Sequence, residues 1–169
     1  MNLRIGFLLA ALAGASLVLA GCGRSETPSS GAAASAAAAP AADGKRAIDL
    51  SADDTMKFNL TEIRAKSGEP LRITLKNTGR MPKQAMAHNW VLVKPMSDAD
   101  LNAFGTAASN KAPDYLPADR SVVLAATKLV GSGESDTIEI TAPATPGEYP
   151  FICTFPGHFA IMKGKLIVN

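Results

Sequence analysis

Cysteine, histidine and the aromatic residues are scarce in this chain of 169 residues. There are two cysteines, two histidines and one tryptophan, and the aromatic residues together make up 5% of the chain. The core must therefore be mostly aliphatic, and two cysteines allow at most one disulfide bond. Enzymes that hold several metal centres need many histidine ligands, so two histidines exclude that class.

A large excess of charge of one sign is also absent. The 17 basic and 15 acidic side chains give a formal net charge of +2. This balance gives no electrostatic reason to expect a nucleic-acid partner. The length predicts one domain with additional segments, not two full domains.

The N-terminal segment lacks the ~20 apolar residues that a membrane-spanning helix needs. Its apolar run covers only residues 7–20, after the positive charge of Arg4, which is typical of a cleaved export signal. Leu19-Ala20-Gly21-Cys22 resembles the lipobox of bacterial lipoproteins. The resemblance implies a signal peptide over residues 1–21 and a Cys22 that carries diacylglycerol and fatty acids such as palmitate. The alternative is an ordinary signal peptide with a chance cysteine.

Residues 22–45 contain mainly alanine, serine, proline and glycine, and no large apolar side chain. Such a segment cannot bury enough apolar surface to offset the entropy lost on ordering, so we expect a flexible, lipidated tether. Alanine favours helices, but Pro28 and Pro40 argue against a long one. The folded domain is then expected over residues 46–169.

The domain shows short strand signals separated by turn residues. Leu71, Ile73 and Leu75 alternate with polar residues, which predicts a half-buried antiparallel strand. Many such strands predict an all-β fold, a Greek-key β-sandwich. The expected strands are residues 47–51, 60–65, 71–76, 89–93, 136–140, 148–152 and 165–168.

Residues 94–120 interrupt this rhythm of strands. Ser97 and Asp100 form a capping-box pattern, followed by Leu101 and Phe104 on one helical face. The pattern predicts one short helix that ends before Pro113. An insertion of this length is expected to pack on the domain as a flap.

Cys153, His158 and Met162 lie within ten positions of one another, and His88 precedes another predicted strand. Taken singly, a histidine here could be a polar edge residue, Cys153 a small buried residue and Met162 a core side chain. Together they comprise both histidines and the one cysteine outside the lipobox. Two imidazoles, a thiolate and a weak thioether form the donor set of a copper site for one-electron transfer. We expect one copper ion per chain, cycling between Cu(I) and Cu(II).

The domain from residue 49 onward resembles azurins, and specifically lipid-modified azurins with an Ala/Pro-rich tether. This resemblance implies a cupredoxin-like sandwich and rests on five matching segments: Met56-Lys-Phe-Asn59, Met81-Pro-Lys-Gln-Ala-Met-Ala-His-Asn-Trp-Val-Leu92, Asp114-Tyr-Leu116, Thr127-Lys-Leu-Val-Gly-Ser-Gly-Glu134, and Cys153-Thr-Phe-Pro-Gly-His158 through Met162-Lys-Gly164.

The resemblance also implies roles for single residues. His88, Cys153 and His158 would be equatorial copper ligands, Met162 the weak axial ligand and the Ala87 carbonyl a distant contact. Around them, Asn89 would tie the two ligand loops together, the backbone N–H of Phe155 would donate to the Cys153 sulfur, and Trp90 would belong to the core. An apolar docking patch would surround the edge of His158 and consist of Met81, Pro82, Met86, Phe155, Pro156, Phe159, Ala160 and Ile161.

Four features depart from the azurin pattern. Azurins usually have glycine in place of Ala87, histidine in place of Asn77 and often histidine in place of Ala126. Most also carry a structural disulfide, which the cysteine count excludes here if Cys22 is lipidated. The fold must then hold without that cross-link.

We expect a one-electron carrier, not an enzyme. Its partners would be c-type cytochromes or a periplasmic or membrane reductase or oxidase, and the protein would be a monomer. Gly23 after Cys22, in place of aspartate, suggests anchoring to the outer membrane, facing the periplasm or the cell surface. Copper storage or delivery, and a surface-interaction lipoprotein, are the alternatives.

Overall fold

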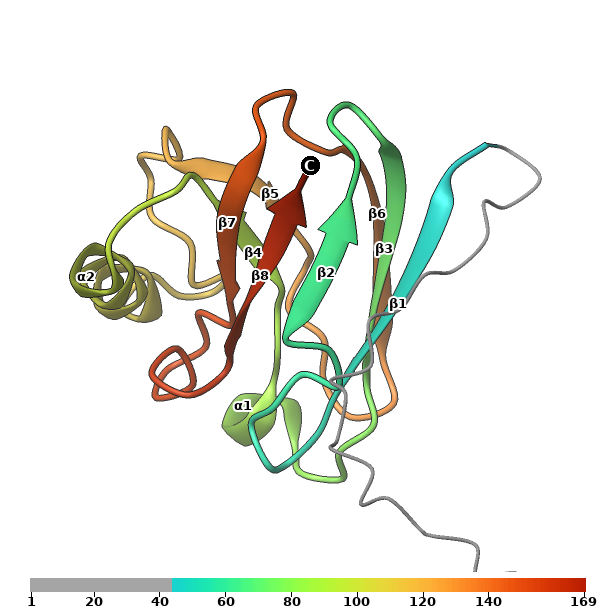
Figure 1. Cartoon of the computed structure of the whole chain (residues 1–169). Coiled ribbons are helices and arrows are strands. Elements are labelled where there is room, and N and C mark those ends of the chain that lie inside the picture. The colour runs from blue at the N-terminus through green and yellow to red at the C-terminus, as the bar shows by residue number, and fades with distance from the viewer. Residues whose placement is uncertain (1–43) are drawn as a thin grey trace, which may run out of the picture. The chain divides into compact units, whose positions relative to one another are not determined.

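Two β-sheets make up most of the structure, a computed structural model that describes residues 44–169 (Figure 1). The described strands are β1 (Arg46–Ala52), β2 (Glu62–Ala65), β3 (Pro70–Asn77), β4 (Val91–Val93), β5 (Val123–Ala126), β6 (Ser135–Thr141), β7 (Gly147–Ile152) and β8 (Lys163–Val168), and the helices are α1 (Lys83–Met86) and α2 (Asp98–Ser109). The predicted signal peptide, Cys22 and nearly all of the predicted tether lie outside the described residues.

One sheet has the strand order β1-β3-β6 and the other has the order β2-β8-β7-β4-β5. This arrangement confirms the predicted all-β sandwich with one short helical insertion. Strand β3 pairs antiparallel with β6 and places Leu71 opposite Ile140. Its alternation predicted an antiparallel strand without indicating which strand it pairs with. The pairs β1–β3 and β2–β8 are parallel, which local alternation did not reveal.

The main core lies between the two sheets. Leu71, Ile73 and Leu75 of β3 are completely buried, and from the other sheet Trp90 and Phe151 pack with ring centroids 5.5 Å apart. Trp90 has no exposed surface, as expected for a core residue. The rest of this core is largely aliphatic, which agrees with the low aromatic content.

A second apolar cluster lies on the outer face of the five-stranded sheet. Val91 and Val93 of β4 pack there with Leu101 of α2, Leu116 and Ile152. Strand β4 is consequently buried on both faces. Residues 94–120 are therefore a cover over this end of the sheet, as the predicted flap required (Figure 1).

Helix α2 begins and ends close to the predicted positions. Ser97 caps it by accepting a hydrogen bond from the backbone N–H of Asp100 at 3.1 Å. Asp98 and Asp100 place negative charge in the first turn, where the helix dipole favours it. The helix ends at Ser109, ahead of Pro113. No helix within residues 44–169 has the length and apolar character needed to cross a membrane.

Candidate metal centre

The structure brings His88, Cys153 and His158 together at one end of the sandwich. Their potential ligand atoms all lie within 4.8 Å of one another. The Cys153 sulfur is 4.0 Å from His88 Nδ1 and 3.6 Å from His158 Nδ1. His88 and Cys153 have no exposed surface and His158 is 3% exposed. Residues separated by 65 positions in the sequence thus form one enclosed group of metal-binding atoms.

The loop between β7 and β8 is folded back on itself, so that its two ends meet. The backbone N–H of Cys153 donates to the Met162 carbonyl at 3.0 Å, and Met162 N–H donates to the His158 carbonyl at 2.8 Å. His158 N–H in turn donates to the Phe155 carbonyl at 3.0 Å. Met162 is completely buried. These bonds hold the thiol, imidazole and thioether residues in one rigid turn, and we call residues 153–162 the ligand loop.

His88 reaches the site from the segment between α1 and β4. Its backbone exchanges two hydrogen bonds with Val130, at 3.0 and 2.8 Å. The next residue, Asn89, joins this segment to the ligand loop: its Nδ2 donates to Thr154 Oγ1, and its Oδ1 accepts from the Thr154 backbone N–H, both at 2.8 Å. The two segments that supply the imidazoles are therefore cross-linked through one buried amide.

Burial controls the protonation of the site. It raises the pKa of the Cys153 thiol to about 12, although backbone hydrogen bonds from Asn89 and Phe155 to the sulfur act in the opposite direction. Burial, together with the neighbouring His88, lowers the pKa of His158 to about 4. Burial also lowers the pKa of His88 against the opposing effect of Asp53. At neutral pH the metal-free site therefore holds a thiol and two neutral imidazoles.

Asn77 is buried next to the site and binds the backbone that carries His88 and Val130, a role that the sequence did not indicate. It is 1% exposed, and its Nδ2 donates to the Met86 carbonyl at 3.0 Å and to the Val130 carbonyl at 3.2 Å. Its Oδ1 accepts from the Gly79 backbone N–H at 2.9 Å. The amide thus fixes the chain on both sides of the backbone pair between His88 and Val130. A buried asparagine at a strand end has no distinctive sequence signal.

Ala87 occupies the position that usually holds glycine in azurins. It is completely buried and extended, with φ −83° and ψ 157°. Any L-residue adopts this conformation without strain. The exchange of glycine for alanine is therefore compatible with the backbone beside His88.

Most of the predicted docking patch is at the surface. Met81 and Ile161 are 41% and 56% exposed, and Pro82, Pro156 and Ala160 are exposed as well. Met86 and Phe159 are only partly exposed.

Phe155 is the exception, and its predicted place in the docking patch was wrong. It is 6% exposed, because its ring is enclosed by Tyr115 on one side and His158 on the other, with centroid distances of 5.3 and 4.8 Å. An apolar loop residue can face either way, and the segment that covers this one lies some 40 positions earlier in the chain.

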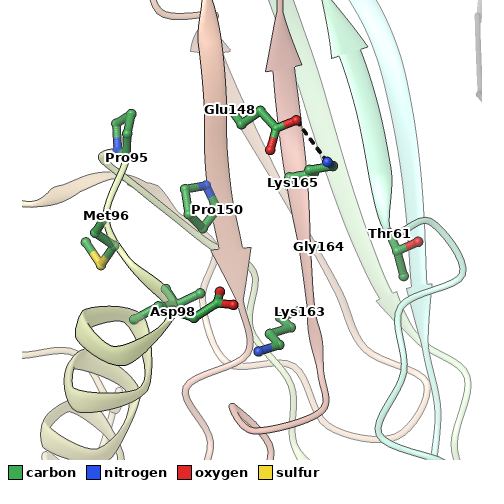
Figure 2. A pocket seen from close by; sticks show the side chains of 10 residues that line it. Thr61, Pro95, Met96, Asp98, Glu148, Pro150, Lys163, Gly164 and Lys165 are labelled. Carbon is green, nitrogen blue, oxygen red and sulfur yellow. Dashed lines mark hydrogen bonds and ion pairs between the residues drawn. The ribbon is translucent and has the colours of Figure 1, made fainter.

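A separate pocket lies beside the start of α2, between that helix and strands β7 and β8 (Figure 2). Its volume is about 350 Å³, and its walls combine Pro95, Met96 and Leu101 with charged side chains. Glu148 and Lys165 form an ion pair there at 2.9 Å. The pocket has no histidine or cysteine in its walls and does not contribute to the metal-binding group.

Comparison with known proteins identifies relatives of this structure. Residues 46–169 match the family of copper-binding proteins described as plastocyanin/azurin. An azurin from Achromobacter denitrificans is 41% identical over 137 residues, which cover 78% of this chain and 90% of the azurin. Outer membrane protein H.8 from Neisseria meningitidis is also 41% identical, over 73% of this chain and 67% of that protein. Among solved structures, the blue copper protein auracyanin A from Chloroflexus aurantiacus is 35% identical with a TM-score of 0.68, covering 75% of this chain and all of auracyanin A.

Proposed function

The chain belongs to the plastocyanin/azurin family of copper-binding proteins, and on that basis we propose which residues hold its copper and where it works. It is a blue copper protein that carries electrons. We assign His88, Cys153 and His158 as the strong ligands and Met162 as the weak axial ligand, with the Ala87 carbonyl as a distant contact. The bound copper supplies a one-electron couple between Cu(I) and Cu(II).

The convergence of two imidazoles and one thiol in a closed site is the observation that carries this assignment. The residues fit copper by their chemistry, since the thiolate and thioether favour Cu(I) and imidazole suits both oxidation states. The backbone bonds within the ligand loop and the Asn89 cross-link hold the donors in place before metal binds. The backbone N–H of Phe155 tunes the donor strength of the Cys153 sulfur.

Electrons would enter and leave through the edge of His158, the ligand beside the exposed apolar patch. We keep this patch as the docking surface without Phe155, so it comprises Met81, Pro82, Met86, Pro156, Phe159, Ala160 and Ile161. Small apolar contacts suit redox partners that associate weakly and separate quickly. The partners we propose are c-type cytochromes or a periplasmic or membrane reductase or oxidase. The carrier itself would be a monomer and not an enzyme.

We further propose that the protein is exported and anchored by lipid on Cys22, most simply in the outer membrane, facing the periplasm or the cell surface. The lipobox-like sequence supports this, and so does the similarity to outer membrane protein H.8. Residues 22–45 would act as the tether. A tether keeps the copper domain in a thin layer and so raises its rate of encounter with partners in the same membrane.

Replacing each cysteine separately tests the ligand assignment. Copper titration of the wild-type protein should give one equivalent and an intense blue band from charge transfer between thiolate and Cu(II). Cys153→Ser should lose that band, whereas Cys22→Ser should keep it as the matched control.

Met162→Leu should stay blue with a higher reduction potential, because a weaker axial donor disfavours Cu(II). A blue Cys153→Ser protein, or a Met162→Leu protein that binds no copper, would contradict the assignment.

A further inference from the structure

The middle of helix α2 lies against the ligand loop at Gly105. This glycine is buried, and a Cβ atom at its position would lie 2.5 Å from Cγ and 2.7 Å from Cβ of Phe159. Separations below 3.0 Å are not tolerated, so the helix can approach this closely only because residue 105 has no side chain. Phe159 directly follows His158 in the chain.

A glycine inside a helix is unfavourable by itself. Relative to alanine, it lowers the helix-forming equilibrium about fivefold at a single position. Gly105 is nevertheless the eighth residue of the twelve in α2. The close packing of Phe159 accounts for glycine at this position, because the ring occupies the space that any side chain at residue 105 would need.

A second contact from the same insertion meets the loop on the other side of His158. The rings of Tyr115 and Phe155 pack edge to face with their centroids 5.3 Å apart. Phe155 also contacts the His158 ring, and its carbonyl accepts the His158 backbone N–H at 3.0 Å. Residues of the insertion therefore touch the loop three positions before His158 and one position after it.

We propose that the 94–120 insertion is a brace that holds the His158 imidazole beside Cys153 in the absence as well as in the presence of copper. Gly105 and Tyr115 are its positioning residues: Gly105 receives the Phe159 ring and Tyr115 supports Phe155. The brace limits how far His158 moves when the metal changes oxidation state. This inference rests on the ligand set proposed above, but the two contacts exist in the protein chain alone.

The contact at Gly105 can be tested on the copper-free protein by a double-mutant cycle. In the wild-type background, Gly105→Ala should lower the folding equilibrium constant about tenfold or more, as expected of an overpacked site. In a Phe159→Gly background, which also removes the Cβ of residue 159, the same change should raise it about fivefold, because only the helix preference remains. Urea unfolding measures the folding equilibrium constants. Equal effects of Gly105→Ala in the two backgrounds would show that Gly105 and Phe159 do not contact each other in this way.

The effect on the site is read from the copper protein. Gly105→Ala and Tyr115→Leu should shift the charge-transfer bands and the reduction potential, whereas Tyr115→Phe should restore the wild-type values by keeping the ring contact. Ala103→Gly is the matched control, because it weakens α2 about fivefold at an exposed position. Unchanged spectra and potential in Tyr115→Leu, or an equal shift in Ala103→Gly, would overturn the brace. Failure of the ligand set would appear instead as a wild-type protein that is not blue.

Discussion

Asn77 shows how one residue can adapt a metal site without touching the metal. It stands where azurins usually have histidine, and its amide is satisfied by Met86, Val130 and Gly79. The amide does not titrate, and it holds both the chain before His88, at Met86, and the opposite chain, at Val130. Asn77 thus provides a buried, hydrogen-bonded support that carries no ionisable group.

This exchange predicts a reduction potential that varies little between pH 6 and 8. The chain has only two histidines, His88 and His158, and both are assigned to copper, so no free imidazole couples proton uptake to reduction. At lower pH, release of His158 from Cu(I) and its protonation stabilise the reduced form and should raise the potential. Cyclic voltammetry measures this directly. A sigmoidal fall of the potential centred near pH 7 would show that another group is coupled.

At the scale of elements, the site depends on how segments are joined. The segment that precedes β4 and the ligand loop after β7 are linked by Asn89, which makes two buried hydrogen bonds to Thr154. Neither segment contains both imidazoles. The geometry of the donors therefore depends on this link as much as on the strands.

Removing one or both of these hydrogen bonds should destabilise the protein by different amounts. Asn89→Ala leaves the buried Thr154 N–H without its acceptor and should lower the free energy of unfolding by about 2–3 kcal/mol. Thr154→Val loses only the hydroxyl contact and should cost about 1 kcal/mol. Urea unfolding of the copper-free variants gives both values. Equal losses for the two variants would mean that the backbone bond contributes nothing.

The sequence predicted some elements and missed others for physical reasons. The alternation in β3 and the Ser97 cap of α2 are local signals, and both led to correct elements. Strand β5 was missed because it is a short edge strand, Val-Leu-Ala-Ala, with an exposed Leu124 and little alternation. Helix α1 has four residues, too few to show a helical period.

Features that depend on contacts between distant segments could not be predicted from the sequence pattern. The parallel pairing of β1 with β3 and of β2 with β8 follows from how the two sheets assemble. The burial of Phe155 depends on Tyr115, which belongs to a distant insertion. The grouping of His88, Cys153 and His158 was predictable, because histidine and cysteine are rare in this chain, whereas Asn77 and Gly105 are of common types.

For the molecule as a whole, the metal-free site should set the pH range of stability. In the unfolded chain a histidine takes up a proton near pH 6.5, whereas in the folded protein the pKa of His158 is about 4. The unfolded state therefore binds more protons between these values, and the free energy of unfolding should fall as the pH drops through this range. Folded Cys153 keeps its proton up to about pH 12, whereas the unfolded thiol loses it near pH 9.0, so stability should also fall above pH 9. The expected acid loss is about 2–3 kcal/mol.

Chemical denaturation of the copper-free protein from pH 4 to 11 tests this expectation. Cys153→Ser is the matched control: it should abolish the alkaline decline attributed to the thiol and retain the acid decline attributed to the imidazoles. A stability curve for the wild type that stays level from pH 6.5 to 4 would contradict neutral, buried histidines.

The proposed lipid anchor concerns the whole molecule, and separate measurements test it. Cys22→Ala should move the protein from the membrane fraction to the soluble exported fraction and leave the blue colour unchanged, because the copper ligands lie far along the chain. Cell fractionation with immunoblotting measures the distribution. Wild-type amounts of Cys22→Ala protein in the membrane would argue against lipid tethering.

The place of the last strand determines when the site can form. Strand β8 (Lys163–Val168) lies inside the five-stranded sheet, between β2 and β7, although it is the last described strand in chain order. Strand β2 therefore has no strand partner in this sheet until β8 docks, and the ligand loop between β7 and β8 is held at both ends only then. We expect stable copper capture only after β8 has docked, so a chain cut after Met162 should lose the metal site even though it still contains His88, Cys153, His158 and Met162.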